Sequence, residues 1–392
     1  MIHNRIISAF SGIVRMECHN YVRYPIYLFC MILMPLCITY FFTDIMDAGL
    51  PTDMPVGVVD LDNSATSRKL MRNLDSYQQS DIVSYYSDIS QARRAMQRCD
   101  IYAFMYIPEG LERDLLSARQ PKVSFYYNNS VLLAGSLLYK EMRAISTLGG
   151  AAVGSAKMQA QGYTPNQIKA TLQPIALDVH AVGNPLLNYN VALSTIIIPA
   201  CLVLFIFLMT SYSIGMELKF SHSRELMSMA GDNVAVAILG KMFPQTCIFA
   251  NVMWFYQYIL FVHLGFPHQC SFLFIMIVGW LLVMAAEGFA VFIFSILPSM
   301  RLSMSVCALW GVLSFSVSGF TFPVGSMDKP LQLLSWMFPM RHYFMIYQMN
   351  ILQGFPLYYS WAYFVALTVF ILLPILTFRH LGKIFNEYEY IQ

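Results

Sequence analysis

The chain has 392 residues, of which 57% are hydrophobic and only 12% are Asp, Glu, Lys or Arg. Soluble domains carry about twice that charged fraction, so the composition excludes an ordinary soluble protein. The formal net charge of +2 comes without any basic block, and we therefore expect no nucleic-acid partner. The eight cysteines include no CxxC pair, which argues against a disulfide framework and against a zinc site.

Residues 1–24 have the pattern of an amphipathic helix that lies on the inner surface of a membrane. The apolar side chains share one face and the polar ones lie elsewhere: Ile6, Phe10, Ile13 and Val14 against His3, Arg5 and Glu17. The apolar run that follows is long enough to span a bilayer, and no small-residue cleavage site ends it. We therefore interpret residues 25–44 as the first membrane helix and not as a cleaved signal.

Six apolar windows come close to the roughly 20 residues that a membrane-spanning helix needs. They are Pro25 to about Phe42, about Val191 to Ser213, about Lys241 to Val262, Ser271 to Leu297, Leu302 to Phe322 and Trp361 to Phe378. The last five make residues 191–392 a predicted five-helix membrane domain. The expected fold class is an α-helical polytopic membrane protein with six membrane helices and an inserted α/β extracytoplasmic domain.

Lysines and arginines near the ends of these windows predict the orientation, because cytoplasmic loops retain positive charge. With the N-terminus inside, nine lie on the cytoplasmic side and only two on the outer side. The nine are Arg5, Arg15, Arg23, Lys219, Arg224, Lys241, Arg301, Arg379 and Lys383, and the two are Lys329 and Arg341. We therefore predict a multi-pass protein of the cell inner membrane, with both termini cytoplasmic and residues 45–190 outside.

Residues 45–190 have an ordinary soluble composition in which predicted strands alternate with helices. The strands are Val56–Val59, Ile82–Tyr86, Tyr102–Ile107 and Val123–Tyr127. Such alternation predicts a parallel or mixed sheet covered by helices, and the proline-free run from Leu132 to about Gln161 predicts a long stalk helix. Three aspartates, Asp60, Asp62 and Asp88, lack the spacing of a calcium loop and are interpreted as helix-capping residues.

The segment 214–240 joins two predicted spans on the cytoplasmic side. Within it, Met216 to Ala230 mixes charged and apolar side chains: Glu217, Lys219, Arg224 and Glu225 beside residues such as Leu226. A short amphipathic helix of this kind fits a groove on a partner protein. The alternative is a surface loop that merely joins two spans.

One acidic residue, Glu287, lies deep in a predicted membrane window. A carboxylate in hydrocarbon is costly unless it is paired or protonated. We expect it to face the interior of the bundle, because the small residues Gly279, Ala286 and Gly288 lie nearby and such residues mark helix contacts. Contact with a substrate or proton is one interpretation, and a structural hydrogen bond to a neighbouring helix is the other.

The segment 323–360 is rich in aromatic residues and is broken by prolines, Pro323 and Pro339 among them. Non-helical backbone at membrane depth is tolerated only where protein buries it. This predicts an external re-entrant loop, and an ordinary aromatic belt is the alternative. We interpret His342 as an interfacial hydrogen-bonding residue and not as a metal ligand, since no second ligand is near it in sequence.

Three blocks give the chain a family resemblance. Pro55 to Ser64 (PVGVVDLDNS) and Ile107 to Asp114 (IPEGLERD) resemble the external domain of permeases from bacterial type-2 ABC exporters. The third block is similar to their C-terminal stretch: Gly319 to Pro323 (GFTFP), Pro330 to Gln332 (PLQ), Phe338 to Tyr343 (FPMRHY) and Gly354. The Gly-Thr that often precedes the equivalent of Glu225-Leu226 is missing. A related family of phage-infection and secretion-accessory proteins shares this external domain.

The resemblance implies a permease subunit that moves a substrate outward using ATP and Mg bound by a separate ABC ATPase subunit. The chain itself lacks a nucleotide motif, because the residues around Gly240-Lys241 do not complete a Walker pattern. No enzymatic activity, catalytic residue, cofactor or metal is therefore expected in this chain. The alternative function is a non-transporting scaffold, or a secretion-accessory or phage-receptor-like protein, that binds through its external domain.

The resemblance also implies partners and site residues. The expected partners besides the ATPase are the lipid bilayer, a second permease copy (homodimer or related heterodimer) and a periplasmic adaptor. Coupling to the ATPase falls to Glu217, Lys219, Arg224, Glu225 and Leu226. The candidates for the pathway or bundle interior are Glu287, from its place in a membrane window, together with Gly319, Pro323, Pro339, His342 and Tyr343. The substrate stays open among drugs, lipids and peptides.

Overall fold

In the computed structural model, the described residues are 2–47, 49–117, 119–173, 183–184 and 188–387. The chain divides into two compact units, Met1–Asp47 with Ala181–Gln392, and Ala48–His180. Parts of the predicted 45–190 domain, namely 174–182 and 185–187, lie outside the described residues. Each unit is described by itself below.

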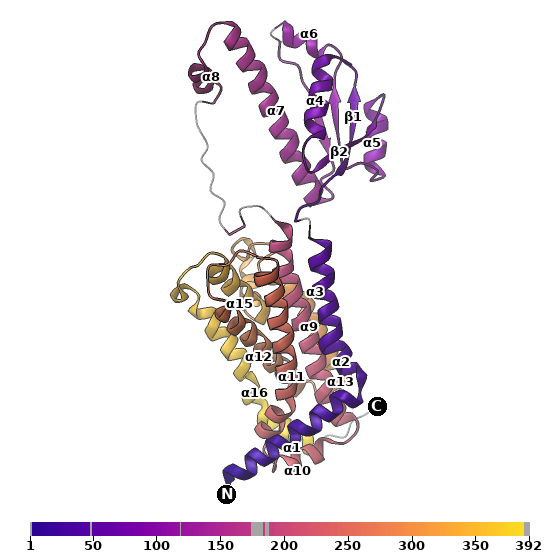
Figure 1. Ribbon diagram of the computed structural model, residues 1–392. Helices are drawn as coiled ribbons and strands as arrows, with labels where there is room; N and C mark the ends of the chain where they lie inside the picture. Colours follow the sequence, from indigo (N-terminus) through magenta and orange to yellow (C-terminus); the bar gives the residue numbers. More distant parts are fainter. Residues whose placement is uncertain (1, 48, 118, 174–182, 185–187, 388–392) are drawn as a thin grey trace. The chain divides into compact units, whose positions relative to one another are not determined.

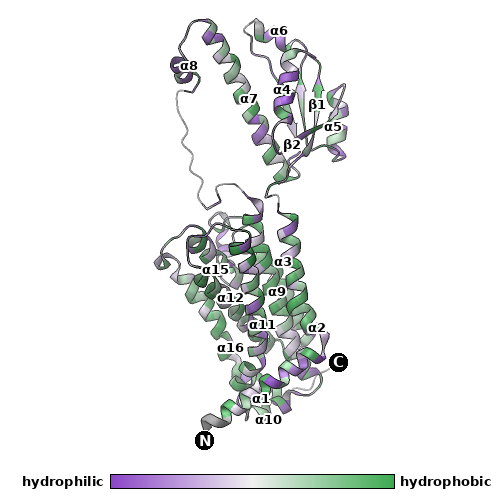
Figure 2. Cartoon of the chain, viewed as in Figure 1, coloured by the Kyte–Doolittle hydropathy of each residue, from purple (hydrophilic) through white to green (hydrophobic). Residues whose placement is uncertain are grey.

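The first unit is a helical bundle, and its apolar helices dominate Figure 2. Its first span joins α2 (Pro25–Leu28), the π-helical turn η1 (Phe29–Leu33) and α3 (Met34–Ile45). The other elements are α1 (Ile2–Arg23), α9 (Tyr189–Lys219), α10 (Ser223–Met229), α11 (Val234–Tyr258), η2 (Ile259–His263), α12 (Phe272–Ile296), α13 (Met300–Val317), η3 (Val324–Ser326), α14 (Lys329–Ser335), α15 (Pro339–Ile346), η4 (Tyr347–Leu352), η5 (Leu357–Tyr359) and α16 (Trp361–Glu387).

Six helical segments in the described part of the chain are long and apolar enough to cross a membrane. They are Pro25–Ile45, Tyr189–Lys219, Val234–His263, Phe272–Ile296, Met300–Val317 and Trp361–Glu387. The predicted six-helix polytopic fold is thereby confirmed. The helices around the predicted 214–240 loop are longer than hydropathy indicates, since α9 continues to Lys219 and α11 begins at Val234. Only residues 220–233 connect them, and α10 occupies half of that connection.

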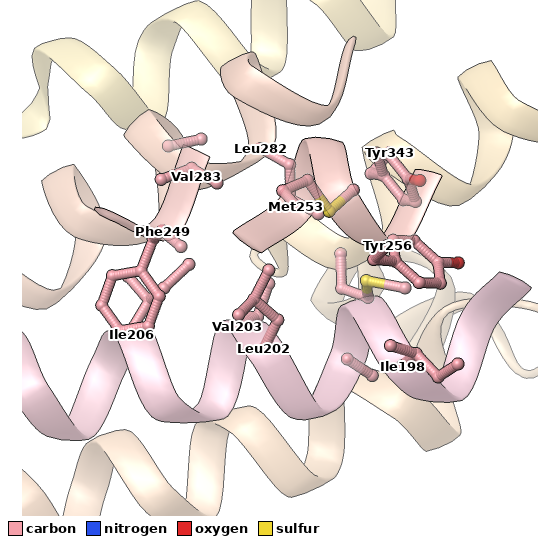
Figure 3. Packing of buried hydrophobic residues seen from close by; sticks show 14 of the residues in the cluster. Ile198, Leu202, Val203, Ile206, Phe249, Met253, Tyr256, Leu282, Val283 and Tyr343 are labelled. Atoms are coloured by element: carbon pink, nitrogen blue, oxygen red, sulfur yellow. The ribbon is translucent and has the colours of Figure 1, made fainter. Parts of the chain in front are cut away.

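The core of this unit lies between α9, α11 and α12. Figure 3 shows Val203 and Ile206 of α9 beside Phe249 of α11, and all three side chains are fully buried. Helix α12 also packs closely on α16. A methyl group added at Gly288 would lie 2.5 Å from the Phe370 carbonyl oxygen, so a residue without a side chain is needed for this approach.

Helix α1 packs against α11 and α10, and it crosses the end of the bundle at which α10 lies (Figure 1). Its buried residues recur at intervals of four, with Ile13, Glu17 and Tyr21 all at most 2% exposed. The prediction that placed Glu17 away from the apolar face is wrong, because Glu17 lies in the same stripe as Ile13. The physical reason is a buried partner for its charge, described below.

The second unit is the inserted α/β domain. Its elements are β1 (Met54–Asp60), α4 (Ala65–Asp75), β2 (Ser80–Tyr85), α5 (Ile89–Gln97), β3 (Ala103–Ile107), α6 (Leu111–Leu116), β4 (Ser124–Tyr127), α7 (Leu132–Ala160) and α8 (Pro165–Leu172). The sheet has the order β2-β1-β3-β4, with β1 parallel to β2 and β3. Strand β4 pairs antiparallel with β3, with Met105 opposite Phe125. The sheet is therefore mixed.

Polar side chains fix the ends of the helices around this sheet. Ser64 and Asp88 accept hydrogen bonds from backbone N–H groups in the first turns of α4 and α5, as N-cap residues do. Asp62 reaches further along the chain and accepts from the backbone N–H of Gly110 at 2.8 Å. A hydrogen bond with the Ser64 side chain lowers the pKa of Asp62 most, and hydrogen bonds from backbone N–H groups, that of Gly110 among them, lower it further.

Candidate functional site

The candidate site is the turn α9–α10–α11 together with the side chains that support it. Arg224 and Glu225 project from α10 and are exposed, and Lys219 is exposed at the end of α9. Leu226, which we predicted as part of a partner-binding face, is 1% exposed and packs into the core under α10. It therefore holds α10 in place and does not present a surface.

Helix α10 is fastened to the last membrane helix. The Ser223 hydroxyl donates to the Phe385 carbonyl oxygen at 2.9 Å, and the Arg224 Nε–H donates to the Asn386 carbonyl oxygen at 3.2 Å. Both acceptors lie near the end of α16. Helix α10 is thereby attached to the end of α16, and a movement of α10 is passed on to α16.

A buried ionic cluster lies beneath the turn. The Lys241 ammonium donates to Glu17 Oε1 at 2.6 Å and to Glu217 Oε1 at 2.8 Å. All three residues are at most 6% exposed. Glu217 was predicted to face a partner, and its burial contradicts that prediction. Because the three side chains belong to α1, α9 and α11, this Glu17–Lys241–Glu217 cluster joins three helices at one point.

The charges of the cluster do not balance, since two carboxyl groups share one ammonium group. Glu17 Oε2 is enclosed and has no hydrogen-bond partner. Burial raises the pKa of Glu17, and the charge of Lys241 opposes this shift. The approach of α1 depends on the residue before Lys241, because a methyl group at Gly240 would lie 3.1 Å from Ile13 Cβ. Helix α1 thus packs against Gly240 and Lys241 of α11.

A second polar group lies deeper in the bundle. Glu287 is 5% exposed, and its carboxyl group accepts a hydrogen bond from the Thr246 hydroxyl of α11. The neighbouring Gln245 donates from Nε2 to Thr210 Oγ1 of α9 at 2.6 Å. Glu287 Oε1 and Gln245 Oε1 are both enclosed without partners. Glu287 therefore lies in a polar layer between helices, and its role in transport stays a prediction.

The remaining predicted residues gather between α13 and α16. Gly319 has φ of 104°, a value that favours glycine, and it turns the chain after α13. Pro323 precedes η3, and Pro339 occupies the first turn of α15, where the absence of an N–H carries no cost. Tyr343 is 1% exposed in the bundle core. The short helices η3, α14 and α15 replace a simple loop here.

His342 is fully buried, and its Nε2 lies 2.9 Å from the Trp336 carbonyl oxygen. Burial is the main reason that the pKa of His342 falls to about 4, so the imidazole is neutral near physiological pH. In the parts of the chain that the structure describes, no three His, Cys, Asp or Glu side chains are grouped to hold a metal ion.

Comparison with known proteins identifies the family of the chain. A family model described as ABC-2 family transporter protein matches residues 25–378. The chain belongs to this family. It is therefore a multi-pass membrane permease subunit of an ABC transporter. No curated protein is similar enough to this ABC-2 permease to be reported as a relative.

Sequence reasoning missed the centre of the site in this ABC-2 permease. Lys241 was treated as the cytoplasmic end of a span and as part of a rejected nucleotide motif, and Glu17 was treated as a polar residue of a surface helix. Two signals pointed to them: Lys241 is a cation beside an apolar window, and Glu17 is four residues after Ile13 on a helix. Neither signal indicates that Lys241 and Glu17 pair with each other.

Proposed function

We propose that this ABC-2 permease is the membrane subunit of a bacterial exporter in the cell inner membrane. A separate ABC ATPase binds ATP and Mg and docks on the exposed face of α10. Both termini lie in the cytoplasm with α10, and the inserted α/β domain lies outside. The substrate moves outward through a pair of permease copies, and a periplasmic adaptor receives it.

The observation that supports this proposal best is the construction of α10. Its outer face presents the charges of Arg224 and Glu225, and its inner face is fixed by Leu226 and by the bond of Ser223 to α16. A partner that moves the outer face of such a helix also moves the membrane helices to which the helix is attached. Charged groups on that face also suit a partner that binds reversibly, since such contacts set specificity and encounter rate.

The orientation has separate support from the distribution of positive charge. Of the lysines and arginines near the ends of the predicted spans, nine belong to one side and two to the other, as expected if the side with nine is cytoplasmic. Helices α1 and α10 lie at the same end of the bundle (Figure 1). A cytoplasmic ATPase would therefore meet α10 and the interfacial helix α1 together.

The decisive experiment combines recovery of the ATPase with transport. The tagged full-length permease is purified from its own cells after crosslinking, and the crosslinked proteins are identified by mass spectrometry. ATP-driven uptake is then measured in inside-out vesicles. We expect an ABC ATPase crosslinked near α10. The double reversal Arg224→Glu/Glu225→Arg should abolish coupling while the protein still inserts, because exposed charge changes cost under about 0.5 kcal/mol and the buried Ser223–Phe385 bond still attaches α10 to α16.

The matched control reverses another exposed pair, Arg98→Asp/Asp100→Arg in the inserted domain, and should leave transport unchanged. Recovery of the permease without any ATPase would contradict the proposal and favour the scaffold alternative. Normal transport by the α10 variant would place the docking site elsewhere, with α1 as the next surface to test.

A further inference from the structure

Arg341 on α15 is a buried cation that has no ion-pair or hydrogen-bond partner among the described residues. Its side chain is 6% exposed, and its Nε and Nη1 atoms are enclosed and make no hydrogen bond. Among the residues that the structure describes, no carboxylate lies within ion-pair distance of it. A buried charge left unpaired is costly, and enclosed donors normally have acceptors. The enclosed Nε and Nη1 groups can therefore bind an acceptor, and an anionic acceptor would also balance the charge.

An aromatic ring beside Arg341 attracts its positive charge, but the ring offers no hydrogen-bond acceptor to the Nε and Nη1 groups. The guanidinium Cζ lies 5.8 Å from the centre of the Trp336 ring, within the range of a cation–π contact. Trp336 in turn stacks on Tyr363, with ring centres 5.8 Å apart. These rings hold the side chain in place and leave its N–H groups without acceptors. His342 Nδ1 beside it is also enclosed without a partner.

The adjacent surface is apolar. Helix α14 and the two residues after it expose several large apolar side chains, namely Leu331, Leu333, Leu334, Trp336 and Met337, with exposed fractions between 36% and 74%. The Trp310 indole N–H donates to the Met337 carbonyl oxygen at 3.2 Å, which fixes this surface next to Arg341. A ligand that satisfies both features has an anionic head and an apolar tail.

We propose that Arg341 binds the phosphate or carboxylate group of an anionic amphiphile whose apolar part lies on the exposed surface of α14. The guanidinium is suited to this role because its planar set of donors matches two oxygens of one group. This site does not depend on the direction of transport or on the ATPase.

The test uses the full chain purified in neutral detergent and in neutral-lipid nanodiscs. Dodecyl phosphate is the free amphiphile, phosphatidylglycerol is the bilayer source, and glycerol phosphate supplies the oxyanion without a tail. Native mass spectrometry counts bound molecules, and thermal unfolding reports stabilisation. We expect Arg341→Gln to bind dodecyl phosphate or phosphatidylglycerol at least about tenfold more weakly, because charge-assisted hydrogen bonds are lost, and Arg341→Lys to retain part of the binding.

The matched control is Lys329→Gln, which removes one exposed positive charge from the same segment and should bind as the wild type does. Leu333→Gln, at a 74% exposed position, should weaken the amphiphiles without unfolding the protein. Binding of phosphatidylglycerol alone would identify a bilayer lipid as the ligand, and binding of dodecyl phosphate alone would identify a free amphiphile.

Three results would overturn the proposal. They are undiminished binding by Arg341→Gln, equal losses in Arg341→Gln and Lys329→Gln, and equal affinity for glycerol phosphate and dodecyl phosphate. Stability gives an independent check. In the absence of anions Arg341→Gln should unfold at the wild-type temperature or above, because it removes an unpaired buried charge; a lower unfolding temperature would show that Arg341 already has a structural partner.

Discussion

Replacing Lys241 with Met should be the most damaging single change in the Glu17–Lys241–Glu217 cluster. The substitution keeps the length of the side chain and removes the ammonium group that lies 2.6 Å and 2.8 Å from two carboxylate oxygens. The side chains of Glu17 and Glu217 are 1% and 8% exposed, so water cannot replace the lost partner. Two carboxyl groups would then share a buried space with no cation.

Breaking a buried ion pair by removing one partner costs about 3–5 kcal/mol. For units of 150–250 residues each kcal/mol lowers the midpoint of unfolding by roughly 2–4 °C, so Lys241→Met should unfold at least about 6 °C below the wild type. Glu17→Gln should cost much less, because it leaves one ammonium group with one carboxylate. The triple variant Glu17→Gln/Lys241→Met/Glu217→Gln should recover most of the loss, since no charge is left buried.

Thermal unfolding of the purified protein in detergent, followed by size-exclusion chromatography, measures these differences. Lys219→Met is the matched control, because the same change is made at an exposed lysine two residues from Glu217, and it should stay within about 0.5 kcal/mol of the wild type. The reasoning is refuted if Lys241→Met unfolds within about 2 °C of the wild type, or if the triple variant is less stable than Lys241→Met.

Two further predictions concern other buried carboxyl groups. Glu287→Gln should unfold like the wild type because an amide oxygen still accepts from Thr246, whereas Glu287→Leu should lose about 1–3 kcal/mol by leaving that hydroxyl unpaired; thermal unfolding of both variants, with a transport assay on the Gln variant, separates a structural role from a transport role. Burial raises the pKa of Glu141 in the inserted domain. At pH values between the unfolded and the folded pKa, the folded form therefore keeps a proton that the unfolded form has lost. Local stability should then fall as the pH rises above the ordinary pKa of Glu. Glu141→Gln should abolish that fall, as measured by comparing hydrogen exchange at the Gln79 amide in the two proteins at each pH.

Hydropathy and periodicity were sufficient for the larger features. The six spans follow from runs of apolar residues, and the strands of the inserted domain follow from short apolar segments such as Val56–Val59 between helix-capping residues. These signals are local, because one segment shows its preference without reference to any other. The alternation of strands and helices limited the sheet to a parallel or mixed one, and the antiparallel pairing of β4 with β3 makes it mixed.

The buried ionic cluster could not be predicted in the same way. Charged residues such as Glu217 and Lys241 lower the hydropathy of a window. The predicted span therefore ended before the end of α9, and the next one began after the start of α11. In the structure the Lys241 ammonium bonds the Glu217 carboxylate, and the helices continue past both residues. The partners of Lys241 are 24 and 224 positions away along the chain, and a single sequence gives no sign of such pairing.

The distance of 224 positions between Glu17 and Lys241 also imposes an order on biosynthesis. The ribosome completes α1 and the whole inserted domain before it makes α11. Until Lys241 has been made, Glu17 lacks the ammonium group to which it is bonded in the folded chain. Helix α1 is therefore translated well before α11, but it can take its place against α11 only after α11 has been made.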